Sequence, residues 1–269
     1  MSRPQTELPE FLANQRRLAP GESFEFTCHP GVPCFNTCCA DVNIILAPLD
    51  VLRLARRLGM TTREFLDTYT GNPVTKDLRL PVVLLKMRDE PAKRCHFLGD
   101  NGCTVYADRP WACRMYPLGM ALPPARAGVD PEPITFVFED DFCQGRHQAD
   151  RRCFTAEAWR KDQNLIGQDE LEAGFRELVG HPWFIGGRTL DPKRIHMFYT
   201  ACYDLDTFRE FVFGSSFLDR FEVPTDLQEL LRNDDASLLR FAFRWLRFAL
   251  FGEPTMTVRE GHDPQGRHS

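Results

Sequence analysis

The stretch CHPGVPCFNTCC, residues 28–39, places four cysteines within twelve residues, and the last two of them, Cys38 and Cys39, are adjacent. A second group of three follows in CHFLGDNGCTVYADRPWAC, residues 95–113. Thiolates crowded in this way repel one another and oxidise easily unless a cationic partner holds them. A soft metal ion or an iron–sulfur cluster is the usual partner. The sequence therefore predicts a cysteine-ligated metal centre around which the chain is organised.

The composition of the 269-residue chain is that of a soluble globular protein, with 43% hydrophobic and 26% charged residues. Its formal net charge of -5 gives no general reason to expect a nucleic-acid partner. No stretch reaches the roughly eighteen uncharged apolar residues that a membrane span needs, and the first residues lack the apolar core of a secretory signal. We therefore expect a cytoplasmic protein. In that reducing compartment, ten cysteines indicate metal binding or catalysis before they indicate disulfides.

Composition divides the chain into four predicted parts. The fold class that we expect is α+β: an irregular cysteine-rich metal-binding core with short strands, flanked by helices and followed by a C-terminal helical extension. The predicted parts are a polar lead-in (1–22), a cysteine-cluster metal-binding domain (23–150), a helical extension (151–252) and a disordered tail (253–269).

Two helices are predicted soon after the first cysteine group. Pro48 suits the first turn, and Gly59 the exit, of a helix whose apolar residues recur at helical spacing. Thr61 with Glu64 forms a capping box that opens the second helix, which is expected to end at Gly71. Both helices should bury one apolar face.

Short strands and a tight turn are predicted around the second cysteine group. Residues 80–87 and 134–140 have the apolar, β-branched and aromatic composition of strands. Between them, Gly-Asp-Asn-Gly at 99–102 is a strong signal for a tight turn. This turn would fold Cys95 back toward Cys103.

Two further helices are predicted toward the C-terminus. Asp108 is expected to cap a short helix that carries Cys113 and that Pro117 ends, and a final long helix is expected over residues 225–251. Three arginines fall on one face of that last helix: Arg240, Arg244 and Arg247. A basic amphipathic helix can lie on an acidic membrane. We favour a helix that packs its apolar face inward, so no membrane-surface partner is expected.

The spacing of the first group matches neither a zinc-finger repeat nor a ferredoxin run. Adjacent cysteines point in different directions on any regular backbone. Cys38 and Cys39 therefore either serve two sites, or one of them is a core residue. With Cys143, eight cysteines over residues 28–143 are candidates. That number suits two four-thiolate sites, or one site with spare thiols.

Charged side chains near the thiols are the next candidates. Four thiolates keep a net negative charge with zinc or with a [4Fe–4S] cluster, so a compensating cation is expected just outside the ligands. Arg109 and Arg114 flank Cys113 and suit this role. His29 and His96 each follow a cysteine and are possible ligands, although a polar loop histidine is the favoured interpretation of both.

The remaining cysteines and the absent motifs point to no particular reaction. Cys153 and Cys202 stand alone in the sequence, and we expect both to be buried core thiols. No glycine-rich phosphate loop, dinucleotide fingerprint or HExxH motif occurs. No C-x-x-C pair occurs either, which counts against a thioredoxin-like oxidoreductase. No catalytic residue is therefore assigned from the sequence.

The order of the cysteines, the segment CHFLGDNGCTVYADRPWACRMYP (95–117) and the later Cys143-Gln-Gly resemble the YkgJ-type cysteine-cluster proteins. These are described as zinc- or iron-chelating domains, and flagellin lysine N-methylase is a relative. The resemblance covers about residues 24–147. It implies eight metal ligands: Cys28, Cys34, Cys38, Cys39, Cys95, Cys103, Cys113 and Cys143. The first two gaps are five and three residues here, where the family's pattern has two and two, so Cys28 could be displaced from the centre.

The function that we expect is binding of an iron–sulfur cluster or zinc, with a redox or metal-handling role. Iron–sulfur is preferred because eight thiolates with an adjacent pair exceed what one tetrahedral zinc uses. Two alternatives stay open. The resemblance implies an S-adenosylmethionine-dependent protein lysine N-methylase-like enzyme. A zinc-stabilised interaction module would instead use the metal only to hold a loop in shape.

Overall fold

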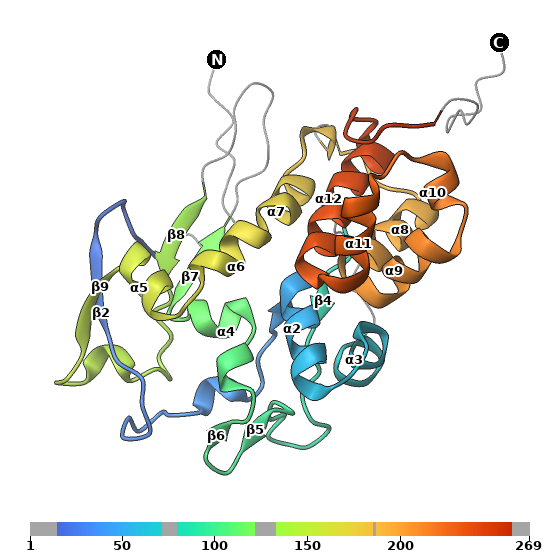
Figure 1. Ribbon diagram of the computed structural model, residues 1–269. Helices are drawn as coiled ribbons and strands as arrows, with labels where there is room; N and C mark the ends of the chain where they lie inside the picture. The colour runs from blue at the N-terminus through green and yellow to red at the C-terminus, as the bar shows by residue number, and fades with distance from the viewer. Residues whose placement is uncertain (1–14, 72–79, 122–132, 185–186, 260–269) are drawn as a thin grey trace. The chain divides into compact units, whose positions relative to one another are not determined.

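The computed structural model describes residues 15–71, 80–121, 133–184 and 187–259 (Figure 1). The chain divides into two compact units that are interleaved in sequence. The first unit consists of the described residues up to Ile44 together with Lys86–Gly167. The second consists of Ile45–Leu85 and the residues from Gln168 onward, within the same described ranges. Short antiparallel strands and helices occur together, so the predicted α+β class is confirmed.

The first unit contains short strands and short helices. A three-stranded antiparallel sheet has the order β1-β8-β7, while β2 pairs with β9 and β5 pairs with β6. The strands are β1 (Arg16–Arg17), β2 (Ser23–Phe26), β5 (Leu98–Gly99), β6 (Gly102–Cys103), β7 (Leu118–Ala121), β8 (Ile134–Val137) and β9 (Arg152–Thr155). The helices are η1 (Thr37–Cys39), η2 (Tyr106–Asp108), α4 (Trp111–Met115), η3 (Gly145–His147) and α5 (Ala156–Asp162).

An aromatic core holds the first unit together. The indole of Trp159 lies edge-on to three phenylalanine rings at centroid separations of 5.0 to 5.8 Å: Phe24, Phe26 and Phe154. Pairs in this orientation contribute about 0.5–1.5 kcal/mol each beyond their burial. The indole Nε1 donates a hydrogen bond of 3.0 Å to the carbonyl of Met115, the last residue of α4. The core therefore fixes the helix that carries Cys113.

The tight turn predicted at residues 99–102 is confirmed. Leu98 pairs with Cys103, and Gly99 with Gly102, in the β5–β6 hairpin. Gly102 has a φ of 109°, which side chains with a Cβ rarely adopt, so this turn depends on glycine. The hairpin places Cys103 on the strand directly after the turn.

The second unit is mainly helical. In it α12 packs against α7, α8, α9 and α11, and Figure 1 shows α12 beside α11. The helices are α2 (Pro48–Leu58), α3 (Thr62–Tyr69), α6 (Ile166–Leu171, which begins at the end of the first unit), α7 (Ala173–Val179), η4 (Pro182–Phe184), α8 (Pro192–Cys202), α9 (Leu205–Gly214), α10 (Phe217–Arg220), α11 (Thr225–Asn233) and α12 (Asp235–Phe251). Two short strands, β3 (Ile45–Leu46) and β4 (Val83–Leu84), pair antiparallel.

The helix signals near residues 48–71 are confirmed. Pro48 begins α2, and Gly59 ends it in the left-handed conformation with a φ of 67°. Thr61 and Glu64 form both hydrogen bonds of the predicted capping box at the start of α3. The strand predicted over residues 80–87 is shorter than expected, because regular pairing covers only Val83–Leu84.

Two predicted helix boundaries are wrong. The helix expected over 225–251 is split into α11 and α12, because Asp234 leaves the helical conformation and its carboxylate caps α12 by accepting from the Ser237 N–H at 2.6 Å. Asp108 is not the cap of α4. Pro110 holds that position without a side-chain cap bond, and extended Arg109 separates Asp108 from the helix.

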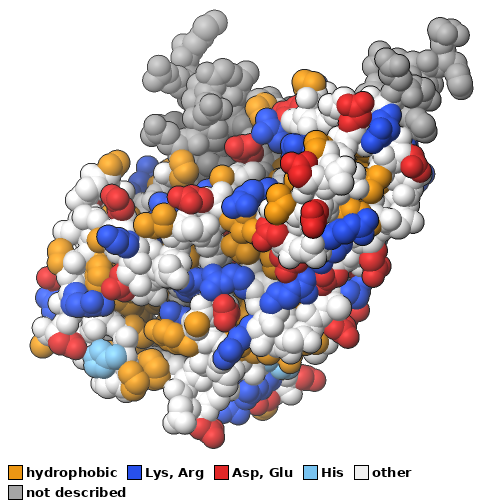
Figure 2. All heavy atoms as spheres, viewed as in Figure 1, with side chains coloured by type: hydrophobic (Ala, Val, Ile, Leu, Met, Phe, Trp, Pro, Cys, Tyr) orange, Lys and Arg blue, Asp and Glu red, His pale blue; other side chains and the backbone are white. Residues whose placement is uncertain are grey.

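The last helix packs its apolar face inward, as we expected from the sequence. Leu239 and Leu246 are fully buried, whereas Arg240 and Arg244 are exposed. Among the helices that the structure describes, none has the length and apolar content needed to cross a bilayer. Figure 2 shows acidic and basic side chains interspersed over the visible face, in keeping with the modest net charge of -5.

The first residues after α12 contact an earlier part of the second unit, where the backbone N–H of Glu222 donates to the carbonyl of Thr257 at 2.9 Å. This contact falls within the tail predicted to be disordered over 253–269, of which residues 260–269 lie outside the described part of the chain.

Candidate metal centre

All eight candidate cysteines lie in the first unit, and none of the described cysteines forms a disulfide. Cys28 and Cys38 are exposed, Cys143 is buried, and the other five are half-buried. The thiols are therefore close to the surface of their unit, where a metal ion or a cluster can reach them.

Consecutive tight turns shape the first cysteine group. The N–H of Thr37 donates to the carbonyl of Cys34, and the N–H of Cys39 donates to that of Asn36, each at 3.0 Å. Asn36 has a φ of 69°, a left-handed conformation that asparagine tolerates better than most residues. The chain then enters η1, a 3-10 turn that contains both adjacent cysteines. Local backbone turns thus place these thiols one after another along a single loop.

The second cysteine group joins the first at the adjacent pair. The N–H of Cys95 donates to the carbonyl of Cys39 at 2.7 Å. Next to it, Ala40 forms an antiparallel bridge with Arg94, and Met87 forms one with Cys95. The Cys39–Cys95 and Ala40–Arg94 contacts align two segments that are more than fifty residues apart in the sequence.

Cys143 joins the first group from a third segment. The N–H of Gln144 donates to the Sγ of Cys34 at 3.1 Å. The Tyr116 hydroxyl lowers the pKa of the nearby Cys143 thiol, against the larger effect of burial, which raises it. The same hydroxyl donates its hydrogen bond to Asp140 at 3.2 Å. Backbone N–H donors to sulfur are among the contacts by which proteins stabilise and tune bound clusters.

The thiols of the first group strongly influence one another. Loss of surrounding water, and next the negative charges of Cys38, Cys34 and Cys143, together raise the pKa of Cys28 to about 11. Burial also raises the pKa of Cys143. A hydrogen bond from Cys39 lowers the pKa of Cys38 to about 7. The pKa shift of Cys38 is therefore opposite in direction to those of Cys28 and Cys143.

The thiols of the second group form another interacting set. The hydrogen bond to Cys38 raises the pKa of Cys39 most, followed by burial and by the charges of Cys113 and Cys95. Burial raises the pKa values of Cys95 and Cys103, and the charge of Cys103 adds to the effect on Cys95. A metal that binds such thiols replaces their protons, so binding is expected to release protons.

Arg109 is the cation that acts on thiols of both groups. Its positive charge lowers the pKa values of Cys28, Cys38 and Cys103. The guanidinium stacks 3.6 Å above the ring centroid of Tyr106, and its Nη2 donates to Gln163 at 3.3 Å. It is thus held in place beside the thiols, as a charge-compensating residue requires.

Arg114 has a different set of contacts from Arg109. It is 4% exposed, and its guanidinium donates to the backbone carbonyls of Gln163 at 2.9 Å and Asn164 at 2.8 Å. These hydrogen bonds tie α4 to the turn after α5. Because α4 carries Cys113, Arg114 positions the helix that holds this thiol.

The sequence reasoning missed Arg88. Its guanidinium donates to the carbonyls of His96 at 3.2 Å and Leu98 at 2.7 Å, and its charge lowers the pKa of Cys95. Arg88 lies beside the hairpin because the preceding residue, Met87, forms a β-bridge with Cys95. No local pattern in the sequence predicts this bridge, so Arg88 could not be found from the sequence.

The predictions that Cys153 and Cys202 are buried core thiols have different outcomes. Cys202 is buried at the end of α8, as expected. Cys153 is exposed, because the alternation of β9 turns Phe154 toward the core and its neighbour outward. His29 accepts from the Gly31 N–H at 3.1 Å and contacts Asp150 at 2.9 Å, so both of its ring nitrogens have protein partners. This arrangement agrees with a polar loop histidine.

The donor set has the right chemistry for a soft metal, with thiols, N–H donors to sulfur and a nearby guanidinium. In the described part of the chain, no group of three or more cysteine, histidine or acidic side chains is already arranged to hold a metal ion. Loading therefore requires rotation of the cysteine side chains on the loops described above.

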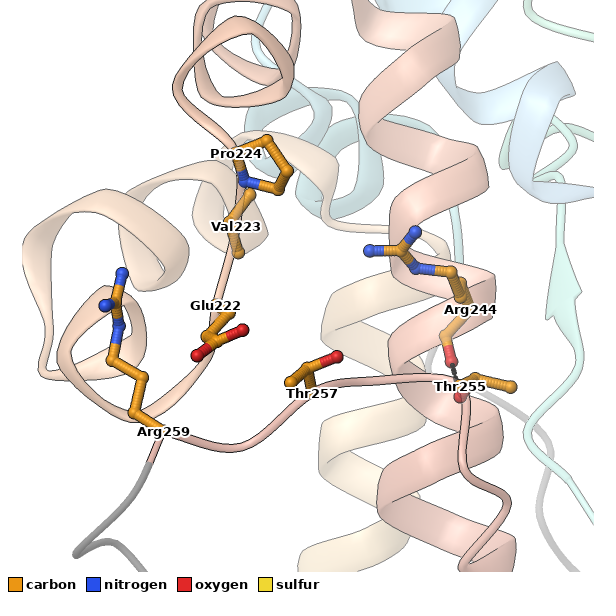
Figure 3. A pocket seen from close by; sticks show the side chains of 7 residues that line it. All are labelled: Glu222, Val223, Pro224, Arg244, Thr255, Thr257 and Arg259. Carbon is orange, nitrogen blue, oxygen red and sulfur yellow. Dashed lines mark hydrogen bonds between the residues drawn. The ribbon is translucent and has the colours of Figure 1, made fainter.

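A pocket in the second unit offers no comparable donors. Figure 3 shows Arg244 and Arg259 on either side of it, with Glu222 and Thr257 between them. None of its lining residues is a cysteine or a histidine. This pocket therefore gives no support for a metal site.

Comparison with known protein families agrees with the geometry. Residues 27–153 match the CxxCxxCC family, which is described as a "Putative zinc- or iron-chelating domain". A search of curated proteins and a search of solved structures each found no match. The matched range contains all eight candidate cysteines. The similarity to this family therefore covers just under half of the chain, including the whole cysteine-rich part.

Proposed function

We propose that this protein binds an iron–sulfur cluster through the cysteines of its first unit and uses it in a redox or metal-handling role. One observation carries the proposal: two distant segments contact the loop of the first cysteine group. The Cys95 N–H donates to the Cys39 carbonyl at 2.7 Å, and the Gln144 N–H, next to Cys143, donates to the Cys34 Sγ at 3.1 Å.

The count of thiols favours a cluster over a single zinc ion. One tetrahedral zinc takes four thiolates at most, whereas the domain offers eight candidates. The Gln144 N–H to Cys34 Sγ bond and the charge of Arg109 are contacts that influence the redox potential of a cluster. When bound, a cluster would supply one-electron chemistry, while these residues would set its charge environment.

The test is purification of the full chain without oxygen, followed by analysis of iron, zinc and acid-labile sulfide and by a visible spectrum. We expect iron and sulfide in comparable amounts and a broad cluster absorption. Stoichiometric zinc without sulfide would instead select a zinc-stabilised domain.

Substitutions test whether the bound metal is held by the proposed cysteine ligands. We expect the double variant Cys103→Ser/Cys113→Ser to lose metal relative to the unmodified protein. Cys153→Ser is the matched control, because it removes an exposed thiol of the same unit that is not a proposed ligand. A protein without any bound transition metal, or full loading in the double variant, would contradict the proposal.

A further inference from the structure

We propose that the pocket in the second unit binds a small phosphate monoester whose body carries hydroxyl groups. The pocket has a volume of about 490 Å³. Sites for small molecules usually have volumes of about 300–1,000 Å³, so this pocket has room for more than a bare ion. The inference goes beyond the function proposed above and does not depend on the metal of the first unit.

Two arginines give the pocket its positive charge. Arg244 extends from α12 and Arg259 from the segment that follows it, and Figure 3 shows them on either side of the pocket. Arg244 lies 5.2 Å from the ring centroid of Phe241, and the Nε of Arg259 donates to the carbonyl of Leu218 at 3.1 Å. Within the described ranges, no carboxylate forms an ion pair with either guanidinium. Both guanidinium groups therefore keep N–H donors for an anion.

A phosphate group suits this arrangement better than a carboxylate does. Arginine binds both anions through paired N–H donors. The three terminal oxygens of a phosphate monoester face different directions, so they can accept from two arginines and a hydroxyl at once. Thr257 supplies that hydroxyl between the two arginines, and its side chain has no hydrogen bond to another described residue. A carboxylate has two oxygens in one plane and uses fewer of these donors.

Glu222 determines which phosphates fit. Its carboxylate lies between the arginines (Figure 3), so the two positive charges and this negative charge leave a net charge of +1. No described residue donates to that carboxylate. Inorganic phosphate is repelled by it, whereas the hydroxyl groups of a phosphate monoester can donate to it. Val223 and Pro224 offer apolar contacts for the carbon atoms of the same ligand.

The backbone around the pocket is held before any ligand binds. The N–H of Arg259 donates to the carbonyl of Arg220 at 2.9 Å. The hydroxyl of Thr255 donates to the carbonyl of Arg244 at 2.8 Å. Met256, between these contacts in the chain, is buried and anchors the segment. A site whose backbone is fixed in this way costs little ordering on binding.

The experiment is isothermal titration calorimetry of the full chain with glycerol 3-phosphate, inorganic phosphate and succinate. We expect saturable binding of glycerol 3-phosphate to one site per chain. Inorganic phosphate and succinate should each bind about tenfold more weakly, because the first lacks the hydroxyl groups and the second lacks the phosphate oxygens.

Substitutions assign the binding to the pocket. Arg244→Met and Arg259→Met should each weaken glycerol 3-phosphate binding by about tenfold or more. Arg240→Met is the matched control and should leave the affinity unchanged, because Arg240 is an exposed arginine of the same helix that does not line the pocket. Glu222→Gln should tighten the binding of inorganic phosphate, because it removes the repulsion. Circular dichroism checks that each variant keeps its helical content.

A second measurement needs no substitution. Hydrogen exchange of the unmodified chain should slow at the amides of residues 255–259 and of Glu222 when glycerol 3-phosphate is added. Absence of saturable binding, equal affinity for succinate, or equal effects of Arg240→Met and Arg244→Met would each overturn the proposal. So would slower exchange confined to amides away from the pocket.

Discussion

The two units of this protein differ in what holds them together. The second unit is built around α12, whose Leu239 and Leu246 are fully buried among the neighbouring helices. In the first unit the strands are two to four residues long. In the first unit, the aromatic core around Trp159 packs against strands β2 and β9. The cysteine loops of that unit are held mainly by turns and backbone bridges. The comparison indicates that apolar burial stabilises the second unit, and we expect the cysteine loops of the first unit to depend on the proposed metal.

Metal removal should give the largest effect and should act on one unit only. Structural zinc sites contribute roughly 10–16 kcal/mol in small domains. We therefore expect chelation without oxygen to abolish hydrogen-exchange protection in the β5–β6 hairpin and at the Cys95 amide. The amides of α12 should keep their protection. Equal loss of protection in both regions would show that the two units do not differ in this way.

Trp159→Ala should destabilise the first unit by about 3–5 kcal/mol, because it removes a buried aromatic side chain and its contacts with three rings. Trp159→Phe is the matched control, since it keeps a ring but loses the hydrogen bond to the Met115 carbonyl. That loss should cost about 1 kcal/mol. Hydrogen exchange in β2 and β9 reports the effect. Unchanged protection in Trp159→Ala would show that the metal alone holds this unit.

Leu239→Ala should destabilise the second unit by about 2–5 kcal/mol, because the side chain is fully buried in α12. Leu230→Ala in α11 is the control, since Leu230 is 53% exposed and its loss should change stability by about 0.5 kcal/mol or less. Urea unfolding followed by circular dichroism measures both. Equal effects of the two substitutions would contradict the packing described for α12.

The last prediction is a pH dependence of the stability of the second unit. Burial, and next the charge of Asp50, raise the pKa of Glu172 from 4.5 to about 8. The folded state then holds a proton that the unfolded state releases above about pH 4.5. The contribution of Glu172 to the free energy of unfolding should therefore be largest below about pH 4.5, and it should decrease as the pH rises toward 8.

The matched variant is Glu172→Gln, which keeps an oxygen that can accept from the Leu49 N–H at 2.8 Å. It should be less sensitive to pH between 5 and 8 than the unmodified protein, as measured by thermal unfolding. An identical pH profile in the variant would show that Glu172 is not the group responsible.

Local signals predicted much of the helical structure. Pro48 with Gly59, and Thr61 with Glu64, specify helix ends through backbone geometry and capping bonds within a few residues. The turn before Gly102 was predictable for the same reason. The split at Asp234 was not predicted, because the apolar pattern continues through a residue whose side chain caps the next helix.

The cysteine residues could be chosen from the sequence, but their arrangement could not. The joining of Cys39 to Cys95, and of Cys34 to the Gln144 N–H, depends on contacts between distant segments. The association of Ile45–Leu85 with the later helices also depends on long-range packing. Arg88 was missed because its place beside Cys95 follows from one such contact.

The most direct test of the central claim is the content of iron, zinc and acid-labile sulfide in the full chain purified without oxygen. The account predicts bound metal that decreases when the thiols of residues 28–143 are replaced by serine, and that remains when Cys153 is replaced. Protein without bound metal, whose β5–β6 hairpin is nevertheless fully protected from hydrogen exchange, would contradict it.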